Sequence, residues 1–261
     1  MGTPQHRPGT FCWYECGTRD AAAAKRFYTE PFGWNAVDVP MPGEMGGHYT
    51  LLKVGDEDVA GLYEMHGPQF ENVPPHWMTY VTSANVDESV ERAKSLGATI
   101  LADPMDVPGV GRLAVLQDPA GATISLFKMA EHHGSAQLGT THGAFCWNEL
   151  ATRDTAAAQT FYTSLFDWGA KVDDDPQMPY TEFQVGGTSV AGMMAMGPQH
   201  GDAPPHWMPY VAVDDCSAAA EKVKQLGGQV VVPPMDVPNV GRFSIITDPT
   251  GAHLAMITLQ S

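Results

Sequence analysis

The chain has 261 residues, of which 43% are hydrophobic and 17% are charged, so it can bury one large core or two ordinary ones. Its formal net charge of −16 disfavours contact with phosphate backbones and anionic lipid, so we expect neither nucleic-acid binding nor membrane binding. No apolar run approaches the roughly 20 residues that span a bilayer, and residues 1–10 lack the apolar core of a signal peptide, which predicts a cytoplasmic protein.

The first elements alternate between strand and helix. An aromatic-rich strand is predicted over residues 11–16, and Asp20 is a plausible N-cap for an alanine-rich helix over 21–28 that must end by Pro31. A strand near 34–39 follows. Two further strands, over 48–54 and 58–63, are joined by a Gly-Asp turn, so this stretch predicts one βαβββ unit.

The pattern then starts again. A strand over 76–82 precedes a helix at about 86–96, whose apolar residues recur at helical spacing and which ends at Gly97. Strands are predicted near 98–102, 112–117 and 123–128. This stretch therefore predicts a second βαβββ unit.

The same landmarks recur in the same order in the second half of the chain. Phe11-Cys12-Trp13 returns as Phe145-Cys146-Trp147, and the Pro-Pro-His-Trp-Met run of 74–78 returns at 204–208. The chain is therefore a tandem duplication of four βαβββ units. We expect an N-terminal domain at 1–130, a polar linker at 131–142 and a C-terminal domain at 143–261.

This arrangement resembles the vicinal oxygen chelate superfamily, which contains glyoxalase I, bleomycin-resistance proteins and extradiol dioxygenases. The resemblance is carried by the strand, helix and Phe-Tyr run from Trp13 to Trp34 and by the Asp118-Pro119-x-Gly121 turn, both of which recur. It is nearest to a two-domain, glyoxalase-like branch often labelled hydroxylase. The resemblance implies an α+β fold, with two tandem half-barrel domains that each form a funnel.

The resemblance also implies where metal-using members place their ligands. Counting from the shared landmarks puts these positions at indole, thioether, hydroxyl and methyl side chains, whereas divalent cations in such sites prefer carboxylate or imidazole. We therefore expect no metal and no other cofactor, which argues against glyoxalase I or dioxygenase chemistry. The counted positions are Trp13, Met78, Ser125, Trp147, Met208 and Ala255.

Side chains alternate along a strand, so residues of the same parity as the counted positions should line the funnels. This predicts two aromatic and thioether linings with a few polar groups, which suit a small molecule. The tryptophans could stack on a flat ligand, or they could simply plug empty funnels. The predicted ligand-binding residues are Trp13, His76, Met78, Tyr80, Ser125, Phe127, Trp147, His206, Met208, Tyr210 and His253.

Glu15 and Glu149 are the candidate catalytic residues, because a carboxylate in an apolar lining can act as a general base. Alternatively, Arg112 and Arg242 hold these carboxylates in structural ion pairs. The two histidines after Pro-Pro could merely begin a strand at the surface. A rebuilt metal site on Glu15 and His76 is a further alternative.

Four functions remain open. The leading one is a metal-independent binder of a small aromatic or electrophilic molecule, of the bleomycin-resistance kind. The second is a metal-independent lyase, isomerase or hydroxylase-type enzyme acting on a secondary metabolite, with a glutamate as base and Tyr80 or Tyr210 as its hydrogen-bond partner. A metal-dependent lyase or dioxygenase with unusual ligands and a non-catalytic interaction or signalling protein complete the set. Either a monomer or a homodimer is compatible with the duplication.

Overall fold

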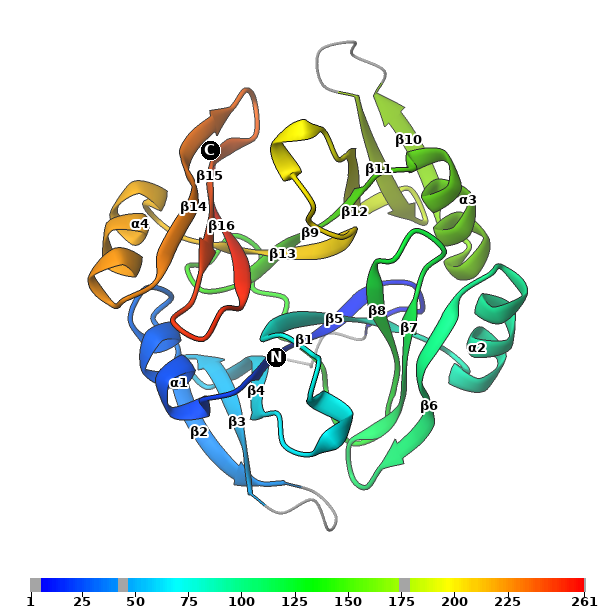
Figure 1. The fold of residues 1–261 in the computed structure, drawn as a ribbon, viewed down its shortest axis with the longest axis horizontal. Coiled ribbons are helices and arrows are strands. Elements are labelled where there is room, and N and C mark those ends of the chain that lie inside the picture. The colour runs from blue at the N-terminus through cyan, green and yellow to red at the C-terminus, as the bar shows by residue number, and fades with distance from the viewer. Residues whose placement is uncertain (1–5, 42–46, 174–178, 261) are drawn as a thin grey trace. The chain divides into compact units, whose positions relative to one another are not determined.

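The computed structural model describes residues 6–41, 47–173 and 179–260, and its elements follow the predicted order (Figure 1). The first βαβββ unit has β1 (Phe11–Thr18), α1 (Ala21–Thr29), β2 (Asn35–Pro40), β3 (His48–Val54) and β4 (Glu57–Glu64). After a 3-10 turn, η2 (Pro68–Phe70), the second unit has β5 (His76–Thr82), α2 (Val86–Ser95), β6 (Thr99–Val107), β7 (Gly111–Gln117) and β8 (Thr123–Met129).

The second half repeats this order. Its first βαβββ unit has β9 (Phe145–Thr152), α3 (Thr155–Phe166), β10 (Gly169–Asp173), β11 (Tyr180–Val185) and β12 (Thr188–Ala195), followed by η3 (Pro198–His200). The last unit has β13 (His206–Ala212), α4 (Cys216–Gln225), β14 (Gln229–Val237), β15 (Gly241–Thr247) and β16 (His253–Leu259). The predicted four βαβββ units are confirmed.

The strands form two eight-stranded sheets with matching order. One runs β2-β3-β4-β1-β5-β8-β7-β6, and the other runs β10-β11-β12-β9-β13-β16-β15-β14. In each βαβββ unit the first strand pairs in parallel with the last, as in β1 with β4 and β5 with β8. The remaining strands form an antiparallel meander. The predicted α+β architecture, with two tandem glyoxalase-type domains, is confirmed.

Repeated aspartates fix the ends of helices and turns. The Asp20 side chain accepts a hydrogen bond from the Ala23 backbone nitrogen at 2.8 Å, which satisfies one of the amides left open at the start of α1. Asp154 caps α3 in the same way. Asp118 closes the Asp-Pro-x-Gly turn, because one carboxylate oxygen accepts from the backbone amides of residues 120, 121 and 122.

The strand β6 is longer than the predicted 98–102. It continues through Pro104 and Met105 to Val107, with register shifts against β7 at two places. The Met-Asp-Val-Pro segments at 105–108 and 235–238 are therefore mostly strand, and the turn lies just beyond each strand. A bulged strand tolerates a proline, which the alternation pattern alone does not reveal.

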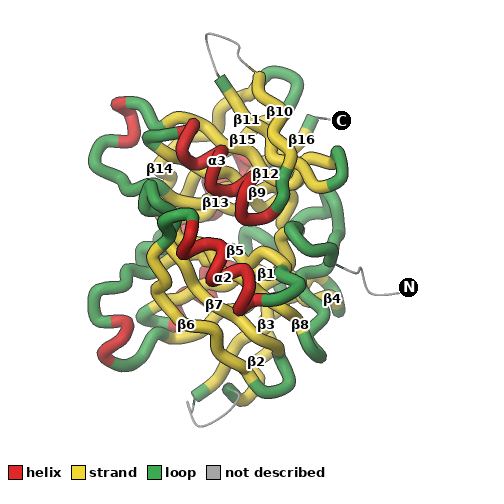
Figure 2. The backbone as a smooth tube through the Cα atoms, turned by 90° about the vertical axis from the view of Figure 1, so that its right-hand side faces the viewer, coloured by secondary structure: helices red, strands yellow, loops and turns green. Residues whose placement is uncertain are grey.

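The chain also divides into two compact units that do not follow the halves of the sequence. Within the described residues, unit 1 comprises 6–12, 79–134 and 147–208, and unit 2 comprises 13–78, 135–146 and 209–260. In unit 1 the helices α2 and α3 lie side by side (Figure 2), and Arg92 forms an ion pair with Asp167 across them at 2.7 Å. Each compact unit thus takes segments from both sequence repeats.

A buried hydrogen-bond chain ties the two repeats together inside unit 1. The indole of Trp207 donates to the Tyr162 hydroxyl at 2.8 Å, and that hydroxyl donates to the second carboxylate oxygen of Asp118 at 2.9 Å. Burial and the nearby Asp118 hold the pKa of Tyr162 far above its usual value, so the phenol stays a donor. Asp118 therefore closes a turn in one repeat and anchors a helix of the other.

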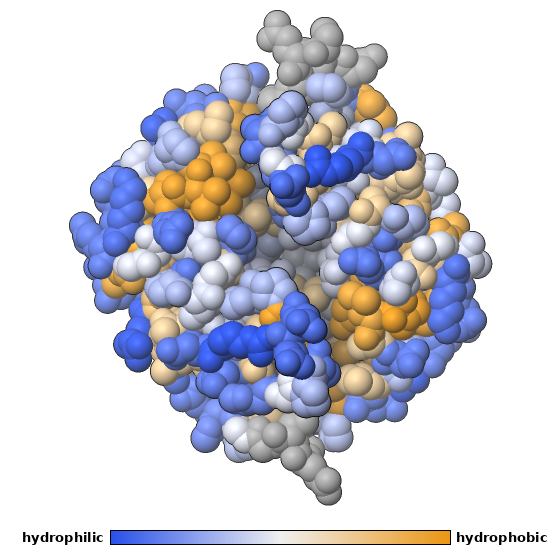
Figure 3. All heavy atoms as spheres, viewed as in Figure 1, coloured by the Kyte–Doolittle hydropathy of each residue, from blue (hydrophilic) through white to orange (hydrophobic). Residues whose placement is uncertain are grey.

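The surface is mostly hydrophilic on the face drawn in Figure 3, with separate apolar areas. Exposed apolar side chains occur at matching positions of the edge strands, for example Leu101 on β6 and Val231 on β14. No helix in the described part of the chain is long and apolar enough to cross a membrane.

We expect Tyr162→Phe to lower the free energy of unfolding by about 1–3 kcal/mol, because it leaves a buried indole donor and a buried carboxylate oxygen without their partner. Urea unfolding monitored by circular dichroism measures this loss. Thr160→Ala, which removes an exposed hydroxyl on the same helix, serves as the control and should change stability by about 0.5 kcal/mol or less. Equal stability of the two variants would contradict the anchoring role.

Candidate functional site

A hydrogen-bond chain joins three aromatic and acidic side chains on the first sheet. Trp13 and Glu15 lie two residues apart on β1 and therefore share a face. The indole of Trp13 donates to the hydroxyl of Tyr49 on β3 at 3.0 Å, and that hydroxyl donates to a carboxylate oxygen of Glu15 at 2.6 Å. We call these three residues the Glu15 cluster, and all of them belong to unit 2.

The second repeat builds the same chain in unit 1. Trp147 donates to the hydroxyl of Tyr180 on β11 at 3.0 Å, and Tyr180 donates to Glu149 at 2.9 Å. We call these residues the Glu149 cluster. Both glutamates are half-buried. The two clusters lie in different compact units, and each is built from strands of its own unit.

A glycine on the neighbouring strand makes room for each tyrosine. Gly61 on β4 pairs directly with Glu15, and a methyl group at Gly61 would lie 1.7 Å from the Tyr49 hydroxyl. The matching Gly192 pairs with Glu149, and a methyl group there would lie 1.8 Å from the Tyr180 hydroxyl. Since no side chain fits at these distances, only glycine lets the phenol reach the carboxylate.

Sequence reasoning missed both tyrosines and both glycines. The repeat nevertheless contains a signal for them, because Tyr-Thr recurs at 49–50 and 180–181, and Ala-Gly recurs at 60–61 and 191–192. These pairs lie in the stretch where the two halves differ in length, so they recur at a different spacing from the other landmarks and are harder to recognise. Tyr49 and Tyr180 donate to Glu15 and Glu149, so each glutamate has a tyrosine partner that the sequence did not suggest beside Tyr80 and Tyr210.

The phenols of both clusters remain protonated. Burial raises the pKa of Tyr49 well above its usual value, and the adjacent Glu15 carboxylate raises it further. Burial and Glu149 raise the pKa of Tyr180 in the same way. Each tyrosine is therefore a fixed donor that holds its carboxylate in one orientation.

The two Pro-Pro histidines begin strands, as one of our alternatives proposed, and both are half-buried. The Nδ1 atom of His76 lies 2.8 Å from the Pro74 carbonyl oxygen, so Nδ1 carries the proton and Nε2 is the basic nitrogen. His206 and Pro204 repeat this contact at 2.8 Å. Burial lowers the pKa of His76, which favours its neutral form.

The remaining predicted lining residues are distributed over both units. In unit 1, Tyr80 pairs across strands with Ser125, and Phe127 packs edge-on against Tyr80, with all three buried. In unit 2, Tyr210 pairs with Ala255. Met78 is half-buried and Met208 is buried, whereas His253 is exposed at the start of β16 beside Thr247.

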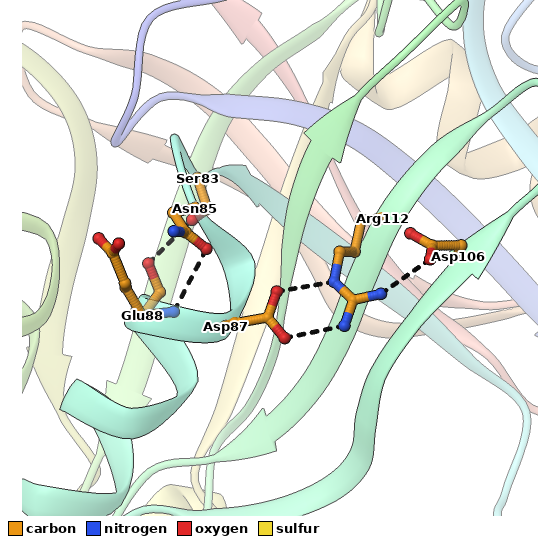
Figure 4. Close-up of polar contacts among 7 residues, drawn as sticks. Ser83, Asn85, Asp87, Glu88, Asp106 and Arg112 are labelled. Atoms are coloured by element: carbon orange, nitrogen blue, oxygen red, sulfur yellow. Dashed lines mark hydrogen bonds and ion pairs between the residues drawn. The ribbon is translucent and has the colours of Figure 1, made fainter.

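The two arginines proposed as alternative partners for the glutamates bind elsewhere. Arg112 forms a two-pronged ion pair with Asp87 at the start of α2 and a second pair with Asp106 (Figure 4). Arg242 binds Ser217 and Asp236. The interpretation that these arginines hold Glu15 and Glu149 is therefore wrong, because aspartates nearer to them take their hydrogen-bond donors.

The side chains do not fit the metal centre implied by the resemblance. The counted positions offer no carboxylate or imidazole, which are the donors that borderline and hard divalent cations prefer. Over residues 6–41, 47–173 and 179–260, no group of three or more His, Cys, Asp or Glu side chains is placed to hold an ion. The alternative site on Glu15 and His76 thus lacks a third such ligand there.

We expect Gly61→Ala to displace the Tyr49 phenol and break the Glu15 cluster, since the added methyl group overlaps the phenol oxygen and ring. Loss of the near-ultraviolet circular dichroism of the packed aromatic rings, with destabilisation by about 1–3 kcal/mol, would report this change. The double variant Gly61→Ala with Tyr49→Ala removes the overlap and should recover part of the stability. If the double variant recovers no stability, Gly61→Ala destabilises the protein through the backbone and not through its overlap with the Tyr49 phenol.

The lowered pKa of His76 predicts a pH dependence of stability. In acid the unfolded chain takes up a proton at the ordinary histidine pKa of about 6.5, whereas folded His76 resists protonation. This residue therefore contributes most stability above pH 6.5 and loses it as the pH falls. Urea unfolding at pH 5.5 and 7.5 should show a smaller difference for His76→Gln than for the parent chain, and an unchanged difference would contradict the assignment.

Comparison with known proteins agrees with this architecture. Residues 11–126 and 144–256 each match the Glyoxalase/Bleomycin resistance protein/Dioxygenase superfamily. The chain is 35% identical over 254 residues to a putative glyoxylase, CFP32, of Mycobacterium tuberculosis, covering 97% of this chain and 96% of that protein. It is 33% identical over 269 residues to the anthracycline biosynthesis protein DnrV of Streptomyces peucetius, covering 97% and 94%.

Solved structures share the fold at low sequence identity. The Mn(II)-bound glyoxalase from Novosphingobium aromaticivorans superposes with a TM-score of 0.65 at 14% identity, covering 98% of this chain and 84% of that chain. The 2,3-dioxygenase LapB from Pseudomonas sp. KL28 gives 0.64 at 11% identity, covering 97% and 94%. With both halves matched, this chain belongs to the glyoxalase/bleomycin resistance protein/dioxygenase superfamily.

Proposed function

We propose that the protein binds a small, planar aromatic molecule at its Trp–Tyr–Glu clusters, without a metal ion at the family's usual ligand positions. The observation that carries this proposal is the hydrogen-bond chain from indole to phenol to carboxylate, which both repeats build around a glycine. A half-buried carboxylate held among aromatic rings suits a ligand with a flat apolar body and a hydrogen-bond donor.

Each group has a distinct part in this proposal. The carboxylate accepts a hydrogen bond from the ligand, since an ionised carboxylate accepts several. The tyrosine holds that carboxylate in place. Trp147 is half-buried and offers more ring surface to a ligand, whereas Trp13 is only 3% exposed and mainly supports Tyr49.

The same geometry favours binding over general-base catalysis. The phenol of Tyr49 donates to Glu15 at 2.6 Å, and a short hydrogen bond to a carboxylate stabilises its charged form. This hydrogen bond also engages one carboxylate oxygen and fixes its orientation, which suits recognition of a ligand. We therefore propose Glu15 and Glu149 as recognition groups rather than as catalytic bases.

The relatives support an aromatic ligand. DnrV of Streptomyces peucetius is named as an anthracycline biosynthesis protein, and anthracyclines are built on flat fused rings. The other relative is named only as a putative glyoxylase. A flat polycyclic compound agrees with the aromatic linings better than a small aliphatic aldehyde does.

We expect isothermal titration calorimetry with 1-naphthol to show binding that Trp147→Ala and Glu149→Leu each weaken by about 1 kcal/mol or more, roughly fivefold in Kd, because both variants remove a ligand contact. Leu101→Ala, an exposed apolar change on β6, is the control and should leave the Kd unchanged. Unchanged affinity in both cluster variants would overturn the proposal.

Elemental analysis of untagged protein tests separately the proposal that no metal ion occupies the family's usual ligand positions. We expect less than about one tenth of an equivalent of zinc, nickel, iron or manganese, since the counted positions lack the preferred ligands. One equivalent of any of these metals would overturn this part of the proposal.

A further inference from the structure

The two clusters differ at the residue that faces the tyrosine across the sheet. Tyr49 pairs directly with Tyr63 on β4, whereas Tyr180 pairs directly with Met194 on β12. Facing side chains on paired strands are near neighbours. The Glu15 cluster therefore has a second phenol beside it where the Glu149 cluster has a thioether.

A second difference lies on the strand that carries the glutamate. Two residues beyond Glu15, Gly17 would place an added methyl group 3.0 Å from the Tyr63 hydroxyl and 3.1 Å from the His76 ring. These distances are tighter than ordinary van der Waals contact, so glycine lets the phenol and the imidazole gather there. The matching residue of β9 is Ala151, which is buried and carries a methyl group where Gly17 has none.

The Tyr63 hydroxyl is a donor of the right kind for a ligand. No hydrogen bond to it occurs among the described residues, and its side chain is half-buried. Burial and the nearby Glu15 raise the pKa of Tyr63, so it remains protonated. Around Gly17 the chain thus brings together a carboxylate acceptor, a phenol donor and a neutral imidazole.

We propose that the Glu15 cluster is a polar subsite selective for aromatic compounds that carry a hydroxyl or carbonyl group on the ring, and that Tyr63, admitted by Gly17, determines this selectivity. The inference depends on the proposed binding function. The Glu149 cluster keeps the carboxylate acceptor but has Met194 and Ala151 at these positions, so it lacks the second polar group and discriminates less between the two kinds of ring. A site with an unsatisfied polar group discriminates strongly against a ligand that leaves it unpaired.

Calorimetric titration of 1-naphthol and naphthalene tests this selectivity on the full chain. The two probes have the same ring system and differ by one hydroxyl group. For the parent protein we expect 1-naphthol to bind one site about tenfold more tightly than naphthalene does. Tyr63→Phe removes only the hydroxyl group, so it should lower the ratio of the two Kd values about threefold or more while the fold is kept.

The reciprocal variant provides a matched control in the other repeat. Met194→Tyr introduces the phenol at the equivalent position, and together with Ala151→Gly it should raise the preference of the second site for 1-naphthol about threefold or more. If Tyr63 has only a structural role, Tyr63→Phe weakens the binding of both probes equally and leaves the ratio of their Kd values unchanged.

The possible results separate the two proposals. If both probes bind but Tyr63→Phe leaves their Kd ratio as in the parent protein, the selectivity inference is overturned and the binding function stands. If neither probe binds the parent protein, both proposals fail. A ratio that falls in Tyr63→Phe and rises in the Met194→Tyr, Ala151→Gly variant supports the assignment.

Discussion

The phenol of Tyr49 reaches the carboxylate of Glu15 only because Gly61 has no side chain, and the rest of the site depends on this close approach. A strand normally presents a side chain at every second position of each face, which keeps neighbouring rings apart. A glycine interrupts that layer and lets a ring from the next strand lie across it. The repetition of this device at Gly192 indicates that it preceded the divergence of the two halves.

After the duplication the clusters changed around a constant centre. The indole, phenol and carboxylate are the same in both repeats, whereas Tyr63 faces one cluster and Met194 the other. Replacing a phenol by a thioether removes a donor but keeps much of the apolar volume, so the fold can tolerate the change while ligand preference shifts. Duplication thus provides two related clusters with different polarity in one chain.

Structural anchoring uses the same residue types as the candidate site but in a different setting. Trp207, Tyr162 and Asp118 also form an indole–phenol–carboxylate chain, yet Tyr162 is fully buried and Asp118 is committed to closing a backbone turn. The half-buried Glu15 instead accepts its hydrogen bond from a phenol of another strand. This difference in exposure distinguishes the buried Trp207–Tyr162–Asp118 chain, which stabilises the fold, from the Glu15 cluster, which we propose binds a ligand.

The repeat, the order of the strands and helices and the family were all predictable from the sequence, because local propensity and the duplicated landmarks agree on them. The aspartate caps and the Asp-Pro-x-Gly turns were predictable for the same reason, since their partners lie within four residues. The hydrogen-bond partner of Glu15 was not predictable from the sequence. Tyr49 lies 34 residues away, and its approach to Glu15 depends on the register of β1, β4 and β3. Three contacts were decided only by the tertiary structure, because they depend on which elements become neighbours. Arg112 pairs with Asp87 and Asp106. Asp118 accepts a hydrogen bond from the other repeat, and a glycine leaves space for each phenol.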